Sequence, residues 1–190
     1  VKPASKGATL PVGGAIESLA RTNKFILNNL DQITDIYVSL DTHLPFQIFF
    51  PTWWRNNQGQ NPAPFTLITA DDVDRGHWQP QFYPQWSINY VHELEHSGKK
   101  TLCIWPPHCL AGTWGNAMVA GLAETLHYWA AARTRQLTPL VKGNTPKTEY
   151  YSILEPEVKD PTHPMGSLNT TFLDASQQYD LIYVAGQAKT

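Results

Sequence analysis

The feature of this chain that most restricts its fold is an alternation of helical and strand-like segments. Helical spacing of apolar residues recurs in four segments, and each is followed by a short apolar run typical of a buried strand. The helices are expected at residues 14–29, 87–97, 116–135 and 169–179, and the strands at 33–40, 100–104, 137–141 and 181–185. Such alternation with short connections predicts an α/β domain with a mostly parallel sheet.

The composition is that of a soluble globular protein and gives no sign of a membrane-spanning or nucleic-acid-binding protein. The 190 residues are 42% apolar and 16% charged with a net charge of −2, which gives no reason to expect nucleic acid or an anionic membrane as partner. No apolar run approaches the roughly 20 residues that span a bilayer, and no signal peptide is recognisable. Cys103 and Cys109 make no disulfide framework. We expect a single domain over residues 1–190 and a cytoplasmic location.

Residues 44–86 interrupt the alternation with a long segment rich in phenylalanine, tryptophan, tyrosine and proline. Prolines break up regular elements, and long loops within a compact domain are usually functional. Two interpretations stay open: a satellite cluster that packs on itself, or a lid over a ligand site, since aromatic side chains serve both.

Polar side chains follow two of the predicted strands. Asp41 and His43 come directly after the strand at 33–40, and His108 follows the strand at 100–104 behind two prolines. The carboxyl ends of parallel strands meet at one edge of a sheet, so these side chains are expected to converge. Two imidazoles and a carboxylate suit a divalent metal ion; zinc is the first candidate, with iron and manganese as alternatives.

A competing metal motif lies in the helix at 87–97. The stretch from His92 to His96 has the His-Glu-x-x-His spacing of zinc peptidases. The helix is expected to end at Gly98, no third ligand is well placed, and the inward stripe of Ile88, Val91 and Leu94 leaves both histidines towards solvent. The peptidase interpretation is therefore the weaker one.

Two further residues have a chemical and a structural interpretation. Lys142 ends the strand at 137–141, where a surface lysine marking the strand's exit is the simplest explanation. Cys109 adjoins His108, but adjacent residues rarely aim side chains at each other, so a packed thiol is expected rather than a nucleophile.

Taken together, the motifs resemble the nicotinamidase and isochorismatase-like cysteine hydrolases, and nicotinamidases most. The resemblance rests on residues 7–15, 41–43, 105–115, 141–143 with 149–152, and 183–188, which occur in family order. The Trp-Pro-Pro-His-Cys-Leu-Ala-Gly-Thr stretch from Trp105 is the most specific of these. The resemblance implies an isochorismatase-like three-layer α/β/α fold with a six-stranded, mainly parallel sheet.

The resemblance also implies roles for individual residues. Asp41, His43 and His108 match the metal ligands, Lys142 matches the catalytic lysine, and Trp105 matches a wall of the substrate pocket with Tyr151 near it. Cys109 does not match the nucleophile. The implied reaction is hydrolysis of a small amide, nicotinamide to nicotinate and ammonia, through a thioester on a cysteine.

Two departures from the family pattern bear on activity. The family's catalytic aspartate and nucleophilic cysteine match no residue here, and their segments are expected before Val1 and after Thr190, so the domain looks incomplete at both ends and the isolated chain is expected to be inactive. A non-catalytic relative that binds a metal or ligand is the alternative. Homo-oligomerisation stays open.

Overall fold

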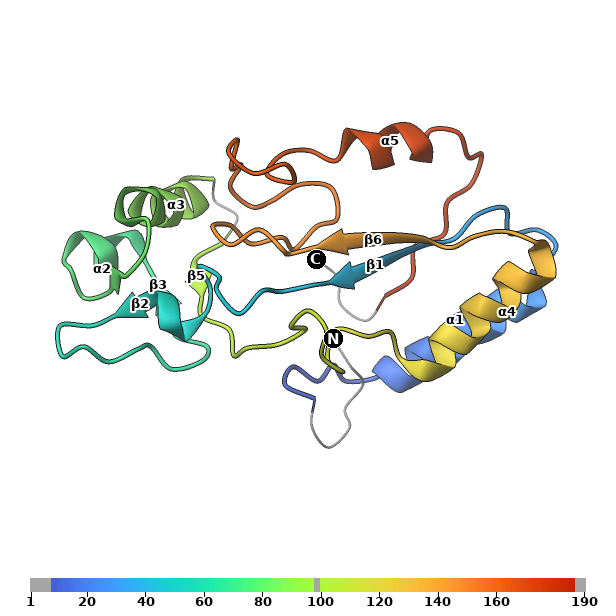
Figure 1. Ribbon diagram of the computed structural model, residues 1–190, viewed down its shortest axis with the longest axis horizontal. Helices are drawn as coiled ribbons and strands as arrows, with labels where there is room; N and C mark the ends of the chain where they lie inside the picture. Colours follow the sequence, from blue (N-terminus) through green and yellow to red (C-terminus); the bar gives the residue numbers. More distant parts are fainter. Residues whose placement is uncertain (1–7, 98–99, 187–190) are drawn as a thin grey trace.

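The computed structural model describes residues 8–97 and 100–186, and it confirms the predicted helices and most of the strands (Figure 1). The elements that correspond to the predicted ones lie within two or three residues of their expected positions at most ends. They are α1 (Ala15–Asn28), β1 (Tyr37–Asp41), α3 (Pro84–His96), β5 (Leu102–Cys103), α4 (Ala120–Arg133), β6 (Thr138–Lys142) and α5 (Thr170–Ser176). Gly98, the predicted end of α3, lies outside the described residues.

A parallel pair of strands forms the centre of the fold. β1 and β6 run side by side in a register that places Tyr37 opposite Thr138 and Asp41 opposite Lys142. Helices α1 and α4 cover one face, where Val38 and Leu137 pack against Leu126 and Trp129. On the other face, the ring of Phe172 in α5 meets Tyr37 edge-on at 5.4 Å.

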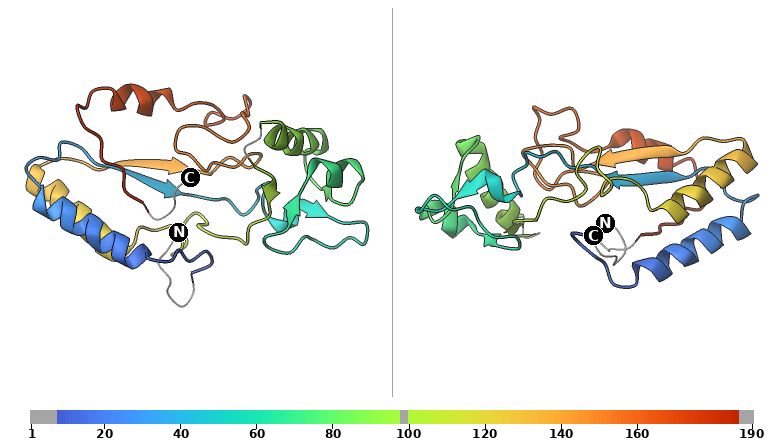
Figure 2. Two further views of the ribbon diagram at one scale, coloured as in Figure 1. Left: turned by 180° about the vertical axis from the view of Figure 1, so that it is seen from behind. Right: turned by 60° about the horizontal axis from the view of Figure 1, so that its bottom comes forward.

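The side chains of Tyr37 and Val38 in β1 thus point to opposite faces of the sheet, because side chains alternate along a strand. Figure 2 shows the resulting order, with α1 and α4 on one side of the strands and α5 on the other. The predicted α/β class, the parallel sheet and the three layers are confirmed.

The sheet is smaller than the resemblance implied. The described residues form three two-stranded pairings, β1 with β6 in parallel and the pairs β2–β4 and β3–β5 antiparallel, not one six-stranded sheet.

The prediction of a buried strand at 181–185 is wrong. Leu181 and Val184 are 67% and 93% exposed, and this segment has no strand pairing. Within the described chain the second edge of β1 has no strand partner, and the 181–185 backbone forms no ladder with it. Of the apolar side chains here, Tyr183 contacts Phe25 of α1, with the ring centroids 4.8 Å apart.

The aromatic segment at 44–86 builds a core of its own against α3. It holds the short elements η1 (Pro51–Trp53), β2 (Trp54–Arg55), β3 (Leu67–Ile68), α2 (Ala70–Asp74) and β4 (Gln79–Pro80). Trp53 and Trp54 are fully buried, and their indole N–H groups donate to Ser87 Oγ and to the Ile48 carbonyl at 3.0 and 2.6 Å. This segment is therefore a satellite cluster.

No helix in the described part of the chain is long and apolar enough to cross a membrane.

Candidate metal and ligand site

The predicted convergence at the sheet edge is present for the two imidazoles. The loop after β5 lies along the residues after β1: His43 N–H donates to the Cys109 carbonyl, and Ala111 N–H donates to the His43 carbonyl, both at 2.9 Å. These bonds bring the rings of His43 and His108 to a centroid distance of 4.5 Å in an edge-to-face arrangement.

Both imidazoles are held in the same tautomer. His43 Nδ1 lies 2.9 Å from the Gly143 carbonyl, and His108 Nδ1 lies 2.8 Å from the Pro106 carbonyl. A carbonyl only accepts, so each Nδ1 carries the proton and each neutral ring keeps its lone pair on Nε2. Metal-binding histidines commonly have this arrangement, in which a backbone carbonyl orients the ring.

Burial keeps both rings neutral. Desolvation lowers the pKa of His43, and it lowers the pKa of His108 to about 4, with the neighbouring His43 adding to the effect. Phe49 and Phe50 of the aromatic segment lie 5.1 and 6.2 Å from the His43 ring, so the satellite core supplies the apolar surroundings. A neutral imidazole is the form that binds a metal ion.

The predicted carboxylate ligand takes a different partner. Asp41 makes a short ion pair with the Lys142 ammonium, which also donates to the Tyr150 carbonyl at 2.9 Å. Burial by itself would raise the pKa of Asp41, but the charge and hydrogen bond of Lys142 bring it below its usual value. Across residues 8–97 and 100–186, no three His, Cys, Asp or Glu side chains are grouped to hold a metal ion. The donor set assembled here is therefore the pair of imidazoles.

Gly143 makes room for His43. Its φ of +80° is in the left-handed region, and a Cβ placed on it would lie 2.7 Å from His43 Cε1. The buried Gln47 amide also donates to the Gly143 carbonyl, at 2.5 Å. At the end of β6, Lys142 thus forms the ion pair, and the following Gly143 leaves the space that the imidazole occupies.

The predicted pocket-wall residues share one buried carboxyl group, which belongs to the 149–152 segment of the resemblance but had no predicted role. Trp105 lies beside His108, with the ring centroids 6.3 Å apart, and its indole N–H donates to Glu149 Oε1 at 2.8 Å. The Tyr151 hydroxyl hydrogen-bonds to the same carboxyl group. In the sequence, only a lone glutamate ahead of two tyrosines could have pointed to this contact.

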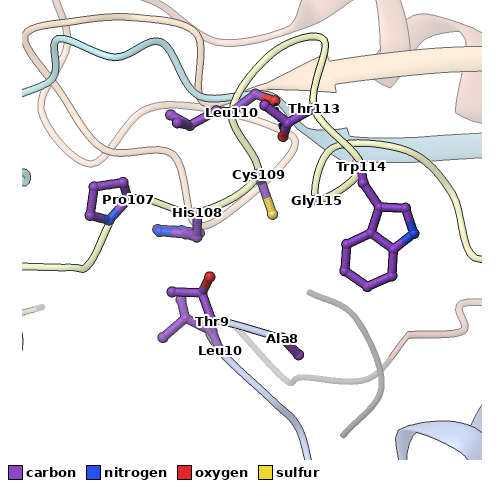
Figure 3. Close-up of a pocket in the computed structure, with 10 residues that line it drawn as sticks. All are labelled: Ala8, Thr9, Leu10, Pro107, His108, Cys109, Leu110, Thr113, Trp114 and Gly115. Atoms are coloured by element: carbon purple, nitrogen blue, oxygen red, sulfur yellow. Dashed lines mark hydrogen bonds between the residues drawn. The ribbon is translucent and has the colours of Figure 1, made fainter. Parts of the chain in front are cut away.

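A pocket of about 170 Å³ lies on the other side of His108. It is formed by residues 8–10, 107–110 and 113–115 (Figure 3). Cys109 is buried with a φ of 46°, and Figure 3 shows its Sγ directed into the pocket while the His108 ring points away from it. The Cys109 thiol and the His108 ring thus point in different directions.

The alternative peptidase motif is a surface feature. His92 Nε2 lies 2.9 Å from Asp74 Oδ1, with the His92 side chain 43% exposed, and His96 is exposed at the end of α3. Val91 and Leu94 are buried, as the helical stripe predicts. Among the described residues the motif is part of no group of three His, Cys, Asp or Glu side chains that could hold a metal ion.

No protein-family model and no curated protein sequence matches this chain. Its structure is similar to that of the yeast nicotinamidase Pnc1p, with a TM-score of 0.52 and 16% identity over 90% of this chain and 64% of the yeast chain. The same yeast enzyme bound to the inhibitor nicotinaldehyde gives 0.50 and 16%, over 93% and 65%. A nicotinamidase/pyrazinamidase from Acinetobacter baumannii gives 0.51 and 19%, over 90% and 59%.

The chain thus spans about three fifths to two thirds of the length of these nicotinamidases, and it shares their fold. The predicted resemblance is confirmed at that level.

Proposed function

We propose that this chain is the metal-binding and lysine-bearing part of a nicotinamidase-like amide hydrolase. The observation that carries the proposal is the pair of imidazoles of His43, which is buried, and His108, which is half-buried, each with Nε2 unprotonated, next to the carboxyl end of β1 in a nicotinamidase fold. The proposed substrate is a small aromatic amide, nicotinamide, and the products are nicotinate and ammonia.

The donor set fits a divalent metal ion in part. His43 and His108 would supply two nitrogen ligands, and Asp41 would be the third if its carboxylate leaves Lys142. Zinc, and after it iron or manganese, suits such a set. When bound there, a metal ion would act as a Lewis acid that orients and polarises the substrate.

The chain's own residues have proposed roles in binding and charge stabilisation. The indole of Trp105 offers a flat wall on which an aromatic ring can stack. Lys142, with its ammonium at the end of β6, would stabilise a thiolate and the negative charge that develops during attack. The proposed attack of a thiolate on the amide carbonyl carbon releases ammonia and forms a thioester, which water cleaves. The resemblance assigns that thiol to a residue other than Cys103 or Cys109.

A non-catalytic relative that binds a metal or ligand is the second candidate. One contact favours it: the Lys142 ammonium is engaged by the Asp41 carboxylate.

Ammonia release from nicotinamide by the full-length protein separates the two candidates. Turnover that Lys142→Ala abolishes while the metal content is retained supports the hydrolase. Metal binding without turnover in the intact protein supports the binding relative, and full activity of Lys142→Ala contradicts the catalytic role of that residue.

A further inference from the structure

A buried carboxyl group joins the two aromatic side chains proposed to line the ligand site. Glu149 is only 5% exposed, and it accepts hydrogen bonds from the Trp105 indole at 2.8 Å and from the Tyr151 hydroxyl. Its backbone N–H donates to the Tyr90 hydroxyl of α3 at 3.1 Å. Three segments far apart in the sequence therefore meet at this one residue.

Besides their hydrogen bonds to Glu149, the two wall residues make ring contacts. Apart from Glu149, the Trp105 ring meets Phe65 at 5.9 Å and His108 at 6.3 Å, and Phe65 is itself 58% exposed. Tyr151 has the Lys100 ammonium over its ring at 3.2 Å. Ring contacts of this kind are weakly directional, whereas a hydrogen bond to a carboxyl group in a buried site is short and directional.

Burial of the Glu149 carboxyl group makes its hydrogen bonds to Trp105 and Tyr151 more important for stability. A buried polar group lowers its free energy by hydrogen bonding, so the alternative to the indole and phenol donors is an unsatisfied carboxyl group. Burial raises the pKa of Glu149 to about 7, and the bonds from Trp105 and Tyr151 oppose that rise by stabilising the ionised form. The two aromatic donors and the carboxyl group therefore hold each other in place.

We propose that Glu149 is a positioning residue that fixes the orientation of Trp105, and with it Tyr151, as one wall of the ligand site beside His108. The ligand class that this wall fits is a flat aromatic ring small enough to stack on one indole. The choice of nicotinamide as probe rests on the proposed function, whereas the positioning of Trp105 does not.

The experiment is NMR of the tryptophan indole N–H groups in the full chain, with the Trp105 signal assigned from its loss in Trp105→Phe. Glu149→Met keeps the side-chain size and removes the acceptor. Glu149→Gln keeps an acceptor oxygen and removes the charge. Glu93→Gln, on the exposed side of α3, is the matched control. Spectra are taken at about pH 8.5, where a carboxyl group with a pKa near 7 is ionised.

We expect the Trp105 indole signal to move in both Glu149 variants and to stay in place in the control. Nicotinamide, added as the probe, should bind about tenfold more weakly to Glu149→Met than to the wild type, and within about threefold of the wild-type affinity to Glu149→Gln. Rescue by the conservative variant distinguishes positioning from a merely structural role.

Either of two results overturns the proposal: an unmoved Trp105 signal in the variants, or wild-type nicotinamide affinity in Glu149→Met despite a displaced indole. If Glu149→Met fails to fold, judged from the indole signals of Trp53 and Trp54, the Trp105 signal of Glu149→Gln decides the matter. If the wild type binds no nicotinamide, the proposed function fails, and the Trp105 signal still decides whether Glu149 holds the indole.

Discussion

Asp41 and Lys142 stand opposite each other in the parallel register of β1 and β6, and their side chains form a short ion pair at the carboxyl ends of the two strands. His43 follows Asp41 by two residues, and Gly143 directly follows Lys142. The Gly143 carbonyl accepts the hydrogen bond from His43 Nδ1. One pair of strand ends thus places an ion pair and a histidine side by side.

Breaking the Asp41–Lys142 ion pair should lower the free energy of unfolding more than breaking a surface ion pair does. In Lys142→Met the carboxylate of Asp41 keeps its burial and loses its ammonium partner, so we expect the free energy of unfolding to fall by about 2 kcal/mol. Lys159→Met is the control, because the Lys159 side chain is exposed and its ammonium pairs with the Glu155 carboxylate at 3.4 Å. Its loss should be below about 0.5 kcal/mol. Urea unfolding of both variants measures the difference, and equal losses would contradict the account.

Gly143→Ala should displace His43. An alanine there has a strained backbone at φ +80° and a Cβ that clashes with the imidazole. Gly59→Ala separates the two effects, because Gly59 has a φ of +76° and no atom within 4 Å of an added Cβ. We expect each variant to lose about 1 kcal/mol of stability from backbone strain. Only Gly143→Ala should also weaken Zn²⁺ binding, as measured by calorimetry; unchanged binding would contradict the proposed seat.

Glu149 should make stability depend on pH. Its pKa is raised from 4.5 to about 7 in the folded state, so the folded protein binds more protons than the unfolded chain between these values. Stability relative to Glu149→Gln should therefore fall as the pH rises from about 4.5 to about 7, by up to about 3 kcal/mol in total.

Besides the two aromatic donors, the charged groups facing this carboxyl group are Glu157, which raises its pKa, and Lys100, which lowers it. Unfolding of the wild type and Glu149→Gln in urea across this range measures the effect. A difference that stays constant with pH would contradict the burial of an ionisable carboxyl group.

The convergence of His43 and His108 could be predicted from apolar runs that end just before each residue, on the assumption that both strands share one parallel sheet. In the structure β5 pairs with β3 in antiparallel fashion, and His108 reaches His43 because the loop after β5 bridges to the residues after β1. The pairing of Asp41 with Lys142 could not be predicted. Either residue could equally face solvent or a ligand, and the choice depends on the register of strands about 100 residues apart.

The hydrogen-bonding role of Glu149 and the absence of a strand at residues 181–185 could not be predicted from the sequence, for a related reason. A lone glutamate carries no local sign of its burial, which depends on contacts with Trp105 and Tyr90 from distant segments. An apolar run such as 181–185 indicates a strand, but a strand exists only where its backbone pairs with a neighbouring strand, and no such pairing is present here within the described residues.

The most direct test of the proposed site is the affinity of the full chain for Zn²⁺, measured by titration calorimetry at about pH 7, where neutral imidazoles bind metal. We predict that His43→Ala and His108→Ala each lower the affinity by at least about tenfold, the range seen when contacts of a metal site are lost. His92→Ala and His96→Ala should leave it unchanged. Loss of Zn²⁺ binding in the second pair with retention in the first would contradict the site at the sheet edge and favour the peptidase motif.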